Sequence, residues 1–209
     1  MGREELAEVA RIIEKHGLVA LSDEIYGRLT YGVEHTCIAT LPQMKENTIL
    51  LGGFSKAYAM TGWRLGYVAA SQEVIAAMFK IHQYTIMCAP TMAQVAAIEA
   101  LKSGEDDVTN MVEDYNRRRL VMVKGLNKIG LPCFEPKGAF YAFPSIKGTG
   151  MTSEEFAEKL LLEEKVAVVP GTAFGQYGEG YVRCCYATSL ADIEEALNRM
   201  GRFVERHRK

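Results

Sequence analysis

The first apolar residues of the chain recur at helical spacing. The repeating positions are Leu6, Val9, Ala10 and Ile13. Residues three and four positions apart lie on one face of a helix, so this pattern predicts an amphipathic helix. Gly17 follows it as a candidate C-terminal cap.

Three short apolar runs follow, at residues 18–21, 48–51 and 65–70. Continuous apolar runs of this length are typical of strands that are buried on both faces of a sheet. The first run ends at Ser22-Asp23-Glu24, and the second leads into residues 52–56 (GGFSK), so polar residues follow the ends of two strands. In open α/β sheets ligands bind beyond the carboxyl ends of the strands, so this edge is a candidate site.

The rest of the chain alternates between helical and strand patterns. Helices are predicted at residues 72–82, after Pro90, at about 106–129, at 153–164 and at 190–207. Short strands are predicted at 138–143, 166–169 and 181–186. Gly130 would end the long helix, and Ser189 is the candidate N-cap of the last one. A domain boundary near residue 118 would divide the chain into domains 1–118 and 119–209.

Composition argues against several functional classes. The 209 residues carry a formal net charge of −2, with basic and acidic residues mixed along the chain. We therefore expect no nucleic-acid partner and interpret the basic clusters at 117–119 and 206–209 as solvated. No apolar run approaches the roughly 20 residues that span a bilayer, and the acidic start is unlike a signal peptide. We expect no membrane partner and a cytoplasmic location.

The cysteines and histidines indicate neither disulfides nor metal. The five cysteines are an odd number and include no CxxC pair, which favours a reducing compartment. The four histidines are scattered without metal-ligand spacing.

Four features could carry chemistry, although each is common by itself. They are Asp23 with Tyr26, Ser55 with Lys56, Arg64, and Arg183. A lysine after a strand is usually a surface residue, and an aspartate at a strand end is usually a turn cap. Glu24 is most simply a helix-start or surface charge.

Together these residues lie in segments that resemble one family. Residues 53–67 (GFSKAYAMTGWRLGY) resemble the lysine segment of class I/II pyridoxal-phosphate-dependent aminotransferases, of the aspartate and aromatic branch. Residues 22–26 (SDEIY) resemble the segment of that family that contacts the cofactor nitrogen. Further similar segments are 136–141 (PKGAFY), 169–175 (VPGTAFG) and 181–189 (YVRCCYATS). The resemblance implies an α/β fold: part of a fold-type I large domain with a mainly parallel sheet, then a smaller α+β domain.

The resemblance also implies a cofactor, pyridoxal 5'-phosphate, and a role for each candidate site residue in the large domain. Lys56 would be the Schiff-base lysine and would move the proton between the substrate Cα and the cofactor. Asp23 would keep the pyridine nitrogen protonated, and Tyr26 would donate to the phenolic oxygen. Ser55 and Arg64 would bind the phosphate.

The substrate contact implied by the resemblance lies in the second half of the chain. Arg183 would bind the α-carboxylate of an amino acid in bidentate fashion. Gly53 stands where some relatives have a second phosphate-binding serine, so one phosphate contact would be absent. The implied reaction is transamination between an α-amino acid and a 2-oxo acid, in a homodimer.

Two alternatives remain open. A C–S lyase or aminocyclopropane-carboxylate-forming enzyme on the same fold would use the same Lys, Asp, Tyr and Arg. A non-catalytic aminotransferase-like fragment or ligand-sensing module would retain the pocket alone, although no helix-turn-helix precedes the domain.

Family members are about twice as long as this chain. Their first half supplies a glycine-rich phosphate loop, an aromatic ring stacked on the cofactor and an Asn-Pro-x-Gly motif, none of which precedes Lys56 here. We therefore expect a fragment that lacks the amino-terminal half and that alone binds the cofactor weakly and turns over slowly, if at all.

Overall fold

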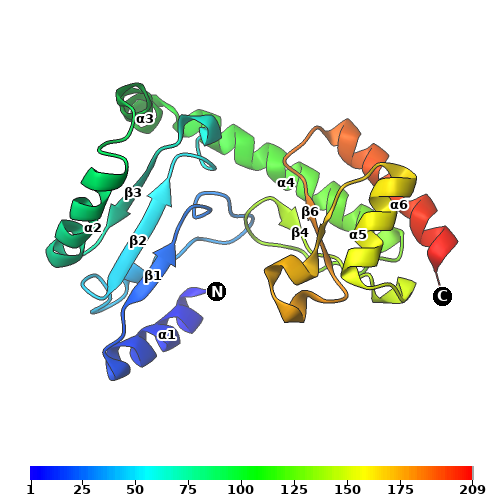
Figure 1. The fold of residues 1–209 in the computed structure, drawn as a ribbon, viewed down its shortest axis with the longest axis horizontal. Coiled ribbons are helices and arrows are strands. Elements are labelled where there is room, and N and C mark those ends of the chain that lie inside the picture. Colours follow the sequence, from blue (N-terminus) through cyan, green and yellow to red (C-terminus); the bar gives the residue numbers. More distant parts are fainter. Residues whose placement is uncertain (209) are drawn as a thin grey trace. The chain divides into compact units, whose positions relative to one another are not determined.

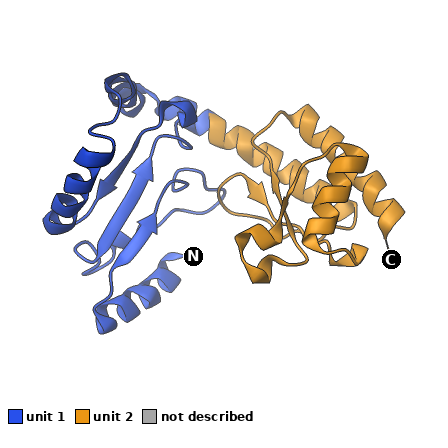
Figure 2. Cartoon of the chain, viewed as in Figure 1, with its two compact units in different colours: residues 1–110 blue, residues 111–209 orange. Residues whose placement is uncertain are grey.

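A computed structural model describes residues 1–208 of the chain (Figure 1). Two compact units divide it between Asn110 and Met111, and Figure 2 colours them separately. The division falls inside one long helix, α4 (Glu105–Lys128). The boundary predicted near residue 118 lies in the same helix, and the assignment of the two parts to a large and a small aminotransferase domain stays a prediction.

The first unit combines a three-stranded sheet with helices. Its elements are α1 (Arg3–His16), β1 (Ala20–Asp23), β2 (Thr48–Gly53), β3 (Gly66–Ala69), α2 (Gln72–Thr85) and α3 (Thr91–Ser103). The strand order is β1-β2-β3, with β1 parallel and β3 antiparallel to β2. The helices and strands predicted for this part are confirmed, and the sheet is mixed.

Helix α1 forms as its apolar spacing predicts. Leu6, Ala10 and Ile13 are buried and pack in a cluster with Ile38, Leu41 and Met44. Acidic residues occupy the first turn, where they interact favourably with the positive end of the helix dipole. Gly17 ends the helix in the left-handed conformation, with φ of 58°, which glycine adopts without strain.

The expectation of burial on both faces is wrong for β1 and for β3, in which Tyr67 is 53% exposed. The run 18–21 was expected to be buried on both faces, but Leu18, Val19 and Leu21 are 50%, 61% and 67% exposed. The physical reason is that β1 and β3 lie at the two edges of the sheet, and each pairs only with β2 among the described strands.

The second unit contains a small antiparallel sheet and two further helices besides its part of α4. Its elements are β4 (Tyr141–Ala142), α5 (Ser153–Glu164), β5 (Val169–Pro170), β6 (Val182–Cys185) and α6 (Leu190–His207). The strand order is β4-β6-β5. The strands are shorter than predicted, and before β4 the reason is that Ala139, with φ of 58°, turns the chain.

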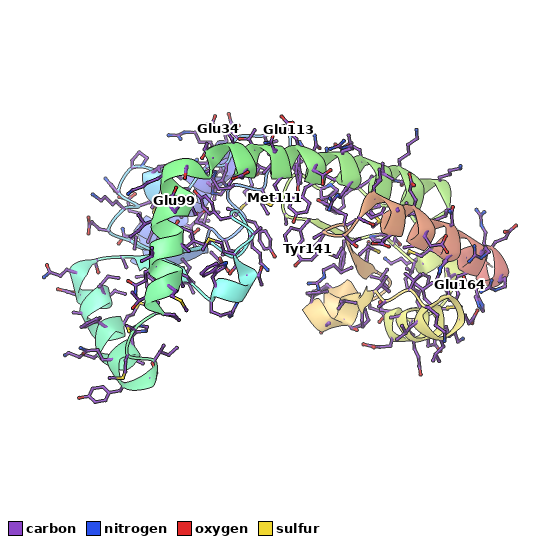
Figure 3. All side chains as sticks on the ribbon, turned by 90° about the horizontal axis from the view of Figure 1, so that it is seen from above. Glu34, Glu99, Met111, Glu113, Tyr141 and Glu164 are labelled. Carbon is purple, nitrogen blue, oxygen red and sulfur yellow. The ribbon has the colours of Figure 1, made fainter. Side chains whose placement is uncertain are left out.

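Helices α5 and α6 enclose much of the core of the second unit. The rings of Phe156 and Phe203 are fully buried and meet edge-on, with centroids 5.2 Å apart. Ser189 caps α6 as predicted, because its hydroxyl accepts a hydrogen bond of 3.1 Å from the Asp192 N–H. Glu164, labelled in Figure 3, is 9% exposed and pairs with Arg202 and Arg206.

Within residues 1–208, no helix is both long enough and apolar enough to cross a lipid bilayer.

Candidate active site

The predicted cofactor-binding residues of the first unit lie on two segments at one edge of its sheet. Strands β1 and β2 are parallel, with Asp23 in register with Leu51, so the carboxyl ends of both strands lie at the same end of the sheet. Asp23 ends β1 and residues 24–29 follow it, and residues 54–65 connect β2 to β3. The expectation that polar residues gather at the carboxyl ends of these strands is confirmed.

The segment after β1 is a turn held by backbone hydrogen bonds. The Asp23 carboxylate accepts from the Ile25 N–H at 3.1 Å, which anchors the aspartate to its own turn. The Gly27 N–H donates to the Glu24 carbonyl at 2.9 Å, and the Leu29 N–H donates to the Tyr26 carbonyl at 2.9 Å. Asp23 itself is exposed and Tyr26 is half-buried.

The lysine segment is a loop that is closed on itself. The Phe54 N–H donates to the Leu65 carbonyl at 3.3 Å and closes the loop at its base. Inside it, the Thr61 hydroxyl donates to the Ser55 carbonyl at 2.9 Å, and the Arg64 guanidinium donates to the Thr61 carbonyl at 3.0 Å. These bonds connect Ser55 and Arg64, the two residues expected to bind phosphate, through Thr61.

Arg64 adopts an uncommon backbone conformation. Its φ of 55° lies in the left-handed region, which few residues other than glycine, asparagine and aspartate enter. The side chain is exposed, so the guanidinium is accessible to an anion. Such a conformation persists only where the surrounding structure holds it in place.

Lys56 and Tyr26 bring the two segments together. The Lys56 Nζ lies 6.0 Å from the centroid of the Tyr26 ring, within the range of a cation–π contact. Gly53 brings the segments close as well, because a Cβ on it would lie 2.9 Å from the Ile25 Cδ1. A serine at position 53 would therefore displace the Ile25 side chain.

These residues fit the functional groups of pyridoxal 5'-phosphate. The cofactor presents an aldehyde, a pyridine nitrogen, a phenolic oxygen and a phosphate, and the two segments offer an amine, a carboxylate, a phenol and a guanidinium. The contact between Lys56 and Tyr26 places the amine and the aromatic ring next to each other. The individual roles expected for these residues stay predictions.

Arg183 belongs to the second unit, where it lies on β6. Its guanidinium carbon lies 4.4 Å from the centroid of the Tyr141 ring and 4.8 Å from that of Phe174. Tyr141 is labelled in Figure 3. Within residues 1–208 no carboxylate pairs with Arg183, so the guanidinium N–H groups are able to donate to an anionic ligand.

A cavity of about 500 Å³ adjoins both segments of the first unit. It is lined by Glu24, Ile25, Arg28, Gly53, Phe54, Ala57, Tyr58, Tyr67 and Leu101. None of the five predicted cofactor-binding residues, all of which the structure describes, lines this cavity. We therefore do not assign it to the cofactor.

Charges beside the turn are paired. Arg28 donates to the carboxylate of Glu105, and this hydrogen bond raises the pKa of Arg28. Burial raises the pKa of the Cys37 thiol, and the nearby Glu24 carboxylate adds to the shift.

In the second unit, burial raises the pKa of Cys184 to about 12, so this thiol is protonated and unsuited to nucleophilic chemistry at neutral pH.

The prediction for Glu24 is wrong. The sequence predicts a helix-start or surface charge, but the Glu24 side chain is only 12% exposed and contacts Ser22 and His35. No helix begins there. The sequence carries no pattern that reveals this contact, because Glu24 and His35 are separated by an irregular segment. Among residues 1–208, no group of three or more His, Cys, Asp or Glu side chains could hold a metal ion.

Comparison with known proteins decides the family. The family model described as aminotransferase class I and II matches residues 1–200. The chain belongs to this family. The family and the α/β fold class predicted from the sequence are therefore confirmed.

Individual aminotransferases resemble this family member closely. YugH of Bacillus subtilis (strain 168) is 59% identical over 204 residues, covering 98% of this chain and 53% of the relative. The aspartate aminotransferase of Pyrococcus abyssi is 49% identical over 205 residues, covering 97% and 53%. The solved aromatic aminotransferase of Pyrococcus horikoshii OT3 superposes with a TM-score of 0.96 at 47% identity, over 99% of this chain and 56% of that one. The chain spans about half the length of the curated relatives it matches.

Proposed function

We propose that this chain carries the lysine-bearing part of a transaminating site, which moves an amino group between an α-amino acid and a 2-oxo acid. The proposal depends on one observation above all. In a member of an aminotransferase family, the amine of Lys56 lies beside Tyr26 at the carboxyl edge of two parallel strands. Relatives named as aspartate and aromatic aminotransferases support this substrate class.

Pyridoxal 5'-phosphate is the proposed cofactor. When bound, it supplies an electron-withdrawing ring that stabilises negative charge at the substrate Cα. Arg64 and the Ser55 hydroxyl would hold its phosphate, because a guanidinium fork and a hydroxyl both donate to phosphate oxygens. Asp23 would hold a proton at the ring nitrogen, and the Tyr26 hydroxyl would donate to the phenolic oxygen.

Lys56 and Arg183 are proposed to act on the substrate. Lys56 would attach the cofactor covalently at rest and, once released by the incoming amino acid, would carry a proton from the substrate Cα. Arg183 would bind the α-carboxylate, which favours α-amino acids over simple amines. The homodimer, the cytoplasmic location and the absence of an amino-terminal half expected from the sequence stay predictions.

Amino-group exchange tests the proposal. The chain with pyridoxal 5'-phosphate, glutamate and either oxaloacetate or phenylpyruvate should form a new amino acid slowly. Lys56→Ala should abolish this exchange, whereas Lys45→Ala, at an exposed lysine of the same unit, should not. Exchange that survives Lys56→Ala would contradict the proposal. Release of pyruvate and ammonia from cysteine-type substrates, without exchange, would replace it with the C–S lyase alternative.

A further inference from the structure

The Glu24 carboxylate is surrounded by polar partners, and Glu24 follows Asp23, which is proposed to contact the cofactor. The Ser22 hydroxyl donates to its Oε1 at 2.8 Å, and the His35 ring contacts its Oε2. This carboxylate also contributes to the raised pKa of the nearby Cys37 thiol. With 12% of the side chain exposed, Glu24 depends on these partners, because burying an unpaired charge is costly.

The main chain of Glu24 is fixed as well. Its N–H donates to the Leu51 carbonyl at 2.8 Å, which ties it to β2, and its carbonyl accepts from the Gly27 N–H at 2.9 Å. Asp23 immediately precedes it and Tyr26 follows two positions later. Glu24 is therefore anchored by main chain and side chain between two residues with proposed cofactor roles.

His35 holds the turn from its outer side. A Cβ on Gly27 would lie 3.1 Å from two atoms of the His35 ring and 3.2 Å from the Glu24 carbonyl. The ring thus packs directly against the turn at Gly27 while it contacts the Glu24 carboxylate. It contacts two points of the same turn.

We propose that Glu24, clamped by Ser22 and His35, is a positioning residue that fixes the turn at residues 23–29 and so orients Asp23 and Tyr26 toward the cofactor. Glu24 acts through these neighbours and has no proposed contact with substrate or cofactor. The effect on the cofactor rests on the proposed function, but the effect on the turn does not.

The test compares Glu24→Ala and Glu24→Gln with two controls. Glu34→Ala removes an exposed glutamate next to His35 in the sequence, labelled in Figure 3. Met44→Ala removes a buried side chain of the α1 cluster and destabilises the same unit without touching the turn. All four are made in the full chain.

Amide hydrogen exchange measures the turn directly, without cofactor. In Glu24→Ala, exchange at Gly27 and Leu29 should accelerate about tenfold relative to the amides of α1, because a charge-assisted hydrogen bond is lost. Glu24→Gln keeps an oxygen for Ser22 and should restore most of the protection. Equal acceleration throughout the unit, or no difference from Glu34→Ala, would overturn the inference.

Titration with pyridoxal 5'-phosphate measures the consequence. Glu24→Ala should raise the dissociation constant about tenfold and shift the absorbance band of the bound cofactor, which responds to protonation at the ring nitrogen and phenolic oxygen. Met44→Ala should lower stability without shifting that band. An unshifted band in Glu24→Ala would overturn the orienting role. If the unmodified chain fails to bind the cofactor at Lys56, the proposed function fails. The amide hydrogen-exchange data alone still decide whether Glu24 fixes the turn.

Discussion

The two units of the chain bury their apolar side chains to different degrees. Of the twelve largest fully buried side chains in residues 1–208, ten lie in the second unit and only Leu29 and Met44 in the first. Nineteen of the twenty-six exposed large apolar side chains lie in the first unit. The second unit therefore depends on a packed core, whereas the first depends more on its sheet and on hydrogen-bonded turns.

This contrast shows how the proposed cofactor residues are held. Asp23, Tyr26, Ser55, Lys56 and Arg64 all lie in the first unit, on turns closed by main-chain hydrogen bonds. Their precision depends on groups such as Glu24 and Thr61 that bond those turns. Mutations in the second unit should therefore mainly change stability, whereas mutations at the turns of the first unit should mainly change cofactor binding.

Cysteine reactivity should show the largest difference between the units. At pH 8 about one Cys184 thiol in ten thousand is ionised, because burial raises its pKa to about 12. Cys88 of the first unit is exposed. A thiol reagent followed by peptide mapping should label Cys88 at least about a thousand times faster than Cys184. Comparable rates would show that the core of the second unit opens readily.

Truncation of an aromatic core residue comes next in size. Phe156→Ala should lower the free energy of unfolding of the second unit by about 3–5 kcal/mol, because it leaves a cavity against Phe203. Phe79→Ala, at an exposed position of α2, should change that of the first unit by no more than about 0.5 kcal/mol. Urea titration with amide exchange in α6 and α1 measures both. A small effect of Phe156→Ala would contradict the contrast in packing.

Arg64→Ala should weaken cofactor binding without unfolding either unit. Loss of a charged donor to phosphate should cost about 2 kcal/mol, or roughly a thirtyfold higher dissociation constant for pyridoxal 5'-phosphate. Arg11→Ala, at an exposed arginine that pairs with Glu8 within α1, is the matched control. Equal affinities of the two variants, measured by absorbance titration, would remove Arg64 from the site.

Helix capping should give the smallest effects. Ser189→Ala removes the hydroxyl that accepts from the Asp192 N–H and should lower the stability of the second unit by about 1 kcal/mol. Ser71 precedes α2 in the first unit without such a bond, so Ser71→Ala should change stability by less than about 0.5 kcal/mol. Thermal unfolding that ranks them in the opposite order would contradict the capping geometry.

Much of the fold could be predicted from local pattern. The helical spacing of Leu6, Ala10 and Ile13 and the caps at Gly17 and Ser189 determine α1 and α6 locally, so the sequence reveals them. The burial of β1 could not be predicted, because it depends on how many strands flank it and not on the strand itself.

The residues of the candidate site also differ in whether local sequence is enough to reveal them. Lys56, Asp23 and Arg64 could be proposed because their segments resemble a family. Glu24 was missed because its burial depends on Ser22 and on His35, eleven residues away. A partner at that distance along an irregular segment leaves no periodic signal in the sequence.

The most direct test of the account is borohydride reduction of the chain with pyridoxal 5'-phosphate, followed by peptide mapping. We expect one stable label, on Lys56, and none on the exposed Lys45 or in the Lys56→Ala variant. A label on another lysine, or equal labelling of many, would contradict the assignment of Lys56 and the site built around it.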